Sequence, residues 1–150
     1  MKATTILIIA LIASIFVINN TDGQQIWDFC TGNVNAVFDI EKLTVDPDPP
    51  VIGQSATVYL AGTLNEEVTG GTSSMAIQYF FGGSWRALPV FHGEVCKMTT
   101  CPVPAGPFLY NYTLDVPFIT PQGQYKGVLQ VFDQNNKNIT CLTFNTTLSR

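Results

Sequence analysis

The sequence has little of what enzymes and nucleic-acid binders commonly use. It contains one histidine, His92, and only 12% of its 150 residues are charged. A Ser-His-Asp or Cys-His nucleophile system would therefore have to use that single histidine. The formal net charge is −4 at pH 7, whereas nucleic-acid binders need a basic patch. The composition disfavours most catalytic systems and predicts no nucleic-acid partner.

Long hydrophobic runs are also scarce. The only one is Ile6 to Ile18, with 13 residues, whereas a membrane-spanning helix needs about 20. It follows Met1-Lys2 and precedes the polar stretch NNTDGQQ, an order typical of a secretory signal peptide. We expect residues 1–23 to be the signal peptide and residues 24–150 to form one soluble domain that enters the secretory pathway.

The sequence has four cysteines, Cys30, Cys96, Cys101 and Cys141. An even number after a signal peptide indicates disulfides, and four cysteines allow three pairings. Cys96 and Cys101 enclose only KMTT, so a local bridge between them is natural and leaves Cys30 for Cys141. A zinc site is disfavoured because the cysteines lack C-x-x-C spacing and only one histidine is present. We expect no metal and no cofactor.

Three N-x-[ST] sequons follow the expected cleavage site, at Asn111, Asn138 and Asn145. Each is a weak signal alone, but in a secreted chain each indicates a glycosylation site at an exposed position.

The rest of the sequence reads as short strands with no clear helix. The strongest is 108–116, FLYNYTLDV, where large apolar residues alternate strictly with Leu109, Asn111, Thr113 and Asp115. A second segment, 34–45, changes phase between Ile40 and Leu43, which suggests a bulge. The other expected strands are 56–64, 74–81, 85–91, 125–133 and 139–148. Seven strands separated by Gly, Pro and Asn turns predict an all-β antiparallel sandwich of two sheets.

Asp46 and Asp48, in VDPDPPVIGQ, are the one close pair of carboxylates that invites a catalytic interpretation. Glycosidase carboxylates stand about 5 to 9 Å apart on rigid elements that face a cleft. Here both lie among three prolines, which prevent ladder hydrogen bonds. We therefore interpret 45–54 as a rigid corner whose reversal uses Gly53, and His92 as a histidine at a strand end without a chemical role.

A set of short motifs, in order along nearly the whole mature chain, resembles the ML lipid-recognition domain family. The motifs are Trp27 with Cys30, DPDPPVIGQ at 46–54, Gly62, EEVTGG at 66–71, Cys96, CPVPAG at 101–106, Val116-Pro117, PQGQY at 121–125, Asp133 and ITC at 139–141. They look closest to the phosphatidylglycerol/phosphatidylinositol transfer proteins, cousins of the Niemann–Pick type C cholesterol carrier. That carrier has three disulfides, whereas this chain has cysteines for two.

The resemblance implies an immunoglobulin-like sandwich that holds a lipid between its sheets, and the two disulfides proposed above. It also implies a monomer that contacts membranes transiently and resides outside cells or in the endolysosomal lumen. We expect inward apolar residues to form the lipid-binding wall: Val58, Leu60, Ile77, Tyr79, Phe91, Tyr110, Tyr112, Leu129 and Val131. Phe91 corresponds to an aromatic residue near the cavity mouth of the cholesterol carrier.

The function that follows is a secreted carrier, not an enzyme, that transfers phosphatidylinositol or phosphatidylglycerol between membranes. The alternatives are sterol binding and transport, a recognition module that presents a lipid, and a secreted hydrolase.

Overall fold

The computed structural model describes residues 26–32 and 36–150. The expected signal peptide, 1–23, lies outside these residues. The elements are β1 (Trp27–Phe29), β2 (Phe38–Asp46), β3 (Ser55–Leu64), β4 (Gly71–Phe81), β5 (Ser84–Ala87), β6 (Phe91–Glu94), α1 (Val95–Met98), β7 (Gly106–Asp115), β8 (Gly123–Asp133) and β9 (Asn138–Leu148).

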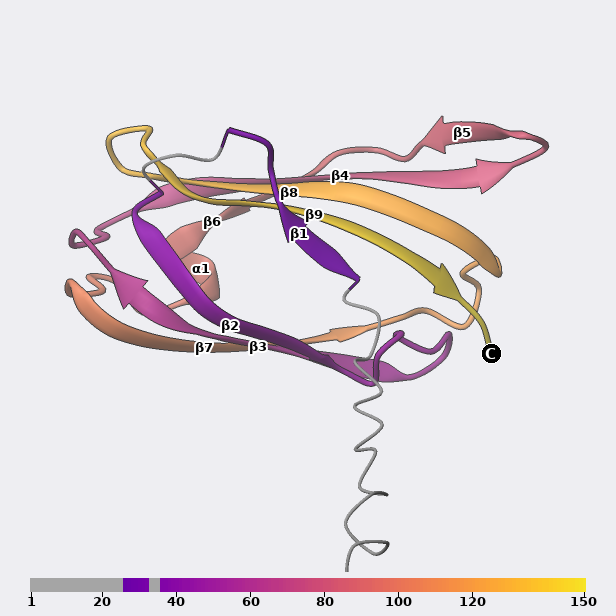
Figure 1. Cartoon of the computed structure of the whole chain (residues 1–150), viewed down its shortest axis with the longest axis horizontal. Coiled ribbons are helices and arrows are strands. Elements are labelled where there is room, and N and C mark those ends of the chain that lie inside the picture. The colour runs from indigo at the N-terminus through magenta and orange to yellow at the C-terminus, as the bar shows by residue number, and fades with distance from the viewer. Residues whose placement is uncertain (1–25, 33–35) are drawn as a thin grey trace, which may run out of the picture.

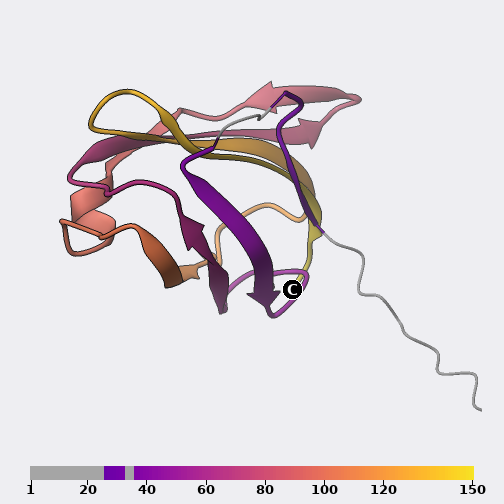
Figure 2. The same ribbon diagram turned by 60° about the vertical axis from the view of Figure 1, so that its left-hand side comes forward.

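The strands form two antiparallel sheets that lie one above the other (Figure 1). The larger has the order β1-β9-β8-β4-β5, and β6 pairs with the same strand, β4, farther along. The smaller has the order β2-β3-β7. The predicted all-β sandwich is therefore confirmed, and the chain crosses between sheets rather than completing one before the other (Figure 2).

The prediction of a single strand at 85–91 is wrong. The structure has β5 and β6 on either side of Pro89, both paired with β4. Leu88 still donates its N–H to the carbonyl of Ile77, but proline has no N–H to donate, so the ladder breaks there. The prediction also missed β1, which is too short to show periodicity, and the single helical turn α1, so the described residues hold nine strands instead of seven.

Two pattern predictions are confirmed, the strong alternation at 108–116 and the bulge in 34–45. β7 alternates as expected, with Leu109 and Asn111 exposed and Phe108 and Tyr110 partly buried. In β2, the pairing with β3 shifts register between Ile40 and Lys42, which is the predicted bulge. The bulge returns Leu43 to the face that Ile40 occupies, so β2 stays apolar toward the other sheet along its length.

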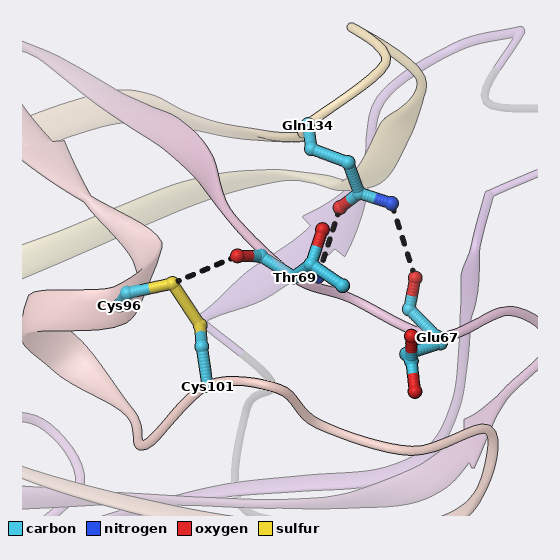
Figure 3. The surroundings of a disulfide bond; sticks show 5 residues. All are labelled: Glu67, Thr69, Cys96, Cys101 and Gln134. Atoms are coloured by element: carbon cyan, nitrogen blue, oxygen red, sulfur yellow. Dashed lines mark hydrogen bonds between the residues drawn. A yellow bond between two sulfur atoms is a disulfide. The ribbon is translucent and has the colours of Figure 1, made fainter.

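A cluster of buried core residues lies at the end of the sandwich next to α1, called here the closed end. Its buried members are Val37, Phe38, Ile40, Leu64, Val68, Val95, Val103, Ile139 and Leu142. The Cys96–Cys101 bridge lies at this end, between α1 and the segment that leads into β7. Figure 3 shows its Cys96 sulfur beside the carbonyl oxygen of Thr69, 3.5 Å away.

Loop 65–70 is connected to the β8–β9 turn by hydrogen bonds and an ion pair at the closed end. The side chain of Gln134 accepts the Thr69 N–H at 3.0 Å and donates to the Glu67 carbonyl at 3.2 Å (Figure 3). Lys137 forms an ion pair with Glu66 at 2.6 Å, and this contact raises the pKa of the lysine. These contacts connect loop 65–70 to the β8–β9 turn at the closed end.

The second disulfide, Cys30–Cys141, ties the end of β1 to β9 within the larger sheet. The backbone N–H of Cys30 also donates to the carbonyl of Cys141 at 3.1 Å. The bridge therefore anchors a three-residue edge strand that has few ladder bonds of its own.

Candidate functional site

The candidate site is the pair of apolar faces that the two sheets turn toward each other, called here the inner faces. In the smaller sheet, Val58 pairs with Tyr112 and Leu60 with Tyr110. Leu60 packs against the core, so side chains two residues apart from it share the inner face. In the larger sheet, Leu129 and Val131 pack against the core in the same way.

An aromatic row runs along each inner face. On β7, Phe108, Tyr110 and Tyr112 stack in succession with ring centroids 6.3 and 6.4 Å apart. Phe108 also meets Phe38 of the core edge to face. The row therefore begins in the core and leads away from it along β7.

On the larger sheet, Tyr79 is the centre of the second row. It stacks on Tyr125 at 4.9 Å and on Phe81 at 6.1 Å. This row lies far from α1, at the end of the sandwich where β4 turns into β5 and β7 leads into β8. We call this the open end.

The inner faces leave large apolar side chains exposed along one edge, whereas Ala56, Val116 and Tyr125 near the open end are buried. Phe81 is 62% exposed, Phe91 55% and Tyr112 50%, although all three lie on inner faces by strand register. β2 and β9 approach each other across the sandwich, so that edge is closed. The edge between β7 and β5–β6 leaves apolar surface that solvent can reach.

The structure puts all nine sequence-predicted wall residues on the inner faces. Val58 and Leu60 are on β3, Ile77 and Tyr79 on β4, Phe91 on β6, Tyr110 and Tyr112 on β7, and Leu129 and Val131 on β8. Leu60, Leu129 and Val131 pack against the core, whereas Tyr79, Tyr112 and Phe91 lie toward the opening. Phe91 pairs with Met75 on the exposed edge, a position suited to a mouth.

The predicted wall did not include Tyr125 and Phe81, two inner-face aromatics near the open end. Tyr125 has the same phase as Leu129 along β8, and Phe81 the same phase as Tyr79 along β4. Period two counted back from Leu129 gives Tyr125. Phe81 was less visible because β4 is apolar on both faces near its end.

The inner faces carry tyrosine hydroxyls that stay protonated near neutral pH. Burial raises the pKa of Tyr110, and the neighbouring Tyr112 raises it further. Burial likewise raises the pKa of Tyr125, with a smaller effect from Tyr79. Because the ordinary pKa of tyrosine is already 10.0, these rings add hydrogen-bonding tips and no charge to an apolar surface.

Two open hollows lie on the outer face of the larger sheet, away from the predicted wall. One of ≈ 790 Å³ is lined by Ile26, Trp27, Asp28, Ala76, Gln78, Lys126, Gly127, Val128, Thr143, Phe144 and Asn145. The other, of ≈ 650 Å³, includes His92, Glu94 and Lys97. Both mix charged, polar and apolar groups, so neither offers a continuous apolar surface for an acyl chain.

The residues that sequence analysis considered for chemistry are dispersed. Asp46, the last residue of β2, and Asp48, in the corner that follows, are both exposed. His92 is exposed on β6, opposite Ser74 on the outer face. Within 26–32 and 36–150, no group of three or more His, Cys, Asp or Glu side chains is arranged to hold a metal ion. No described helix has the length and apolarity to cross a membrane.

The three sequons differ in exposure. Asn111 and Asn145 are exposed on outer faces. Asn138 is only partly exposed, its Oδ1 is buried without a hydrogen-bond partner, and Thr140 of the same sequon is buried. The expectation that all three positions are exposed therefore holds for two of them.

Comparison with known proteins gives a consistent result. The family model of the ML domain matches residues 24–148. A Dictyostelium discoideum protein named "putative phosphatidylglycerol/phosphatidylinositol transfer protein" is 49% identical, and the alignment covers 96% of this chain and 97% of that protein. A Mycosarcoma maydis protein named phosphatidylglycerol/phosphatidylinositol transfer protein is 32% identical over 77% of this chain and 62% of its own length.

Two solved structures have the same fold. A Niemann–Pick type C2 protein from the Japanese carpenter ant has a TM-score of 0.60 and 17% identity, covering 82% of this chain and 98% of that chain. Chicken MD-1, crystallised with lipid IVa, has a TM-score of 0.54 and 14% identity, covering 81% and 86%.

Proposed function

The chain belongs to the ML domain family, and we propose that it is a carrier that binds a phospholipid between its sheets and transfers it between membranes. The observation that carries the proposal is the pair of aromatic-lined inner faces, on which Phe81, Phe91 and Tyr112 remain reachable by solvent. The phosphatidylglycerol/phosphatidylinositol transfer proteins to which it is similar support this choice of lipid class.

The chemistry required is burial rather than bond making. A 16-carbon acyl chain is worth roughly 12 kcal/mol when removed from water, at about 0.8 kcal/mol per CH₂. An apolar surface that accepts the chain makes the exchange with a bilayer nearly isoenergetic. The inner-face tyrosines suit the boundary between an acyl chain and its headgroup because each combines an apolar ring with a hydroxyl.

Transfer between vesicles tests the proposal. Donor vesicles would hold labelled phosphatidylinositol, phosphatidylglycerol or a sterol, and acceptor vesicles none. We expect the protein to accelerate movement of the two phospholipids. Sterol transfer alone would favour the sterol carrier, and stable lipid binding without transfer would favour a module that presents lipid to a partner.

We further propose that the protein has no catalytic function, and the corner carboxylates test this. The change Asp46→Asn with Asp48→Asn removes the pair of carboxylates considered above for catalysis. It should leave lipid transfer and stability unchanged within about 0.5 kcal/mol, because both side chains are exposed. Transfer rate and thermal unfolding would be measured. If purified protein hydrolyses a lipid or glycoside and the double variant does not, the hydrolase interpretation is correct.

A place in the secretory pathway, either outside the cell or in the endolysosomal lumen, is part of the proposal. Two disulfides support an oxidising compartment. We propose Asn111 and Asn145 as the glycosylated positions. Asn138 is less suitable because its side chain is partly buried and has little room for a glycan.

A further inference from the structure

The most exposed large apolar side chain among the described residues is Ile119, at 89%, and its neighbour Phe118 is 67% exposed. Both lie in the loop of residues 116–122 between β7 and β8. Exposing two adjacent large apolar side chains is unfavourable unless they meet another apolar phase.

The loop is held in position by its hydrogen bonds. The N–H of Gly53 donates to the carbonyl of Val116 at 2.8 Å, and Thr120 closes a turn by donating to Pro117 at 2.9 Å. The hydroxyl of Tyr125 donates to the carbonyl of Pro121 at 2.8 Å. Phe118 and Ile119 therefore lie on a turn whose backbone is held by hydrogen bonds.

The loop crosses the open end. β7 belongs to the smaller sheet and β8 to the larger, so the loop spans from one sheet to the other (Figure 1). The hydroxyls of Tyr125 and Tyr79 point to its carbonyls at Pro121 and Gln122. The exposed pair thus adjoins one of the two aromatic rows that line the candidate site.

The chemistry around the pair fits a bilayer surface. The guanidinium of Arg150 lies over the ring of Phe118, 4.7 Å from its centroid, which places a cation beside apolar groups as at a membrane interface. Two side chains are far too few for a specific protein interface, which buries at least about 1,200 Å².

We propose that the 116–122 loop is the membrane-docking element, with Phe118 and Ile119 inserted among phospholipid headgroups and the open end turned toward the bilayer. The inference rests on the proposed function, because docking serves a protein that exchanges lipid with a membrane. A small apolar insert gives weak, reversible binding, which suits a carrier that must leave the membrane with its load.

Sedimentation of the full secreted chain with phosphatidylcholine/phosphatidylglycerol vesicles tests the proposal. The double variant Phe118→Ser with Ile119→Ser should bind more than about tenfold more weakly, since each side chain loses its insertion free energy. Leu109→Ser is the matched control because Leu109 is 78% exposed on the outer face of β7, within a strand. Its binding should equal that of the unmodified protein.

A second measurement reports insertion directly. Phe118→Trp should gain fluorescence that shifts to shorter wavelength on vesicles and is quenched by brominated phospholipid. Equal sedimentation of the double variant and the unmodified protein, failure of the unmodified protein to bind, or an unquenched tryptophan would overturn the proposal. So would a dimer, seen by analytical ultracentrifugation without vesicles, that the double variant abolishes, because the loop would then contact a second copy.

Native mass spectrometry of the same samples separates this inference from the carrier function. Loop-dependent vesicle binding by a protein that holds no lipid would uphold docking and refute the carrier. A double variant that binds vesicles normally and has lost its lipid would refute docking and place the loop in the lipid site.

Discussion

Replacing Ile77 with glutamate should reduce the amount of bound phospholipid by more than about 100-fold. Ile77 lies on the inner face of β4, opposite Gly127 and two residues from Tyr79. A carboxylate there would face the acyl chain. Burying a charge costs several kcal/mol, whereas a 100-fold loss of binding corresponds to about 2.7 kcal/mol. Quantitative lipid extraction from the purified variant measures the result.

Ala76→Glu is the matched control for this prediction. Ala76 is the adjacent residue, exposed on the outer face of the same strand, so the variant adds the same charge with no contact to the inner face. Both variants should fold, because neither residue belongs to the buried core, and circular dichroism would verify this. Equal lipid content in the two variants would show that the lipid does not lie on the inner face of β4.

Removing the Cys30–Cys141 bridge should have the largest effect on stability. The two cysteines are 111 residues apart, and the chain-entropy model gives about 4–5 kcal/mol for closing such a loop. A domain of this size is stable by roughly 5–15 kcal/mol, so Cys30→Ser with Cys141→Ser should bring it close to unfolding at about 37 °C. Urea titration of secreted protein would give the free energy of unfolding.

The short bridge provides the comparison. Cys96 and Cys101 are 5 residues apart, and the same model gives about 2 kcal/mol for a loop of that length. The Cys96→Ser with Cys101→Ser variant should therefore remain folded at the same temperature and lose roughly half as much stability. A larger loss for the short bridge would mean that local packing of the closed end outweighs chain entropy.

The sequence was most informative where one face of a strand is buried and the other is exposed to solvent. β7 shows this, since the partly buried Phe108 and Tyr110 alternate with the exposed Leu109 and Asn111. Burial on one face forces period two, so the inner residues could be predicted from the alternation alone. The phase change between Ile40 and Leu43 predicted the bulge for the same reason.

The sequence was less informative where structure depends on distant partners. β5 and β6 are two separate strands that both pair with β4. This pairing depends on β4 and cannot be deduced from residues 85–94 alone. The exposure of Phe118 and Ile119 was also unpredictable, because VPFIT reads as an apolar segment in either a core or a loop. Only the path of the chain from one sheet to the other determines that they protrude.

Photo-crosslinking with a phosphatidylinositol that carries a reactive group in its acyl chain tests the central claim most directly. After irradiation, mass spectrometry would locate the modified side chains. Binding between the sheets predicts adducts on inner-face residues such as Ile77, Tyr110 and Leu129. Adducts confined to the outer hollow, at residues such as Lys126, Val128 and Thr143, would contradict it.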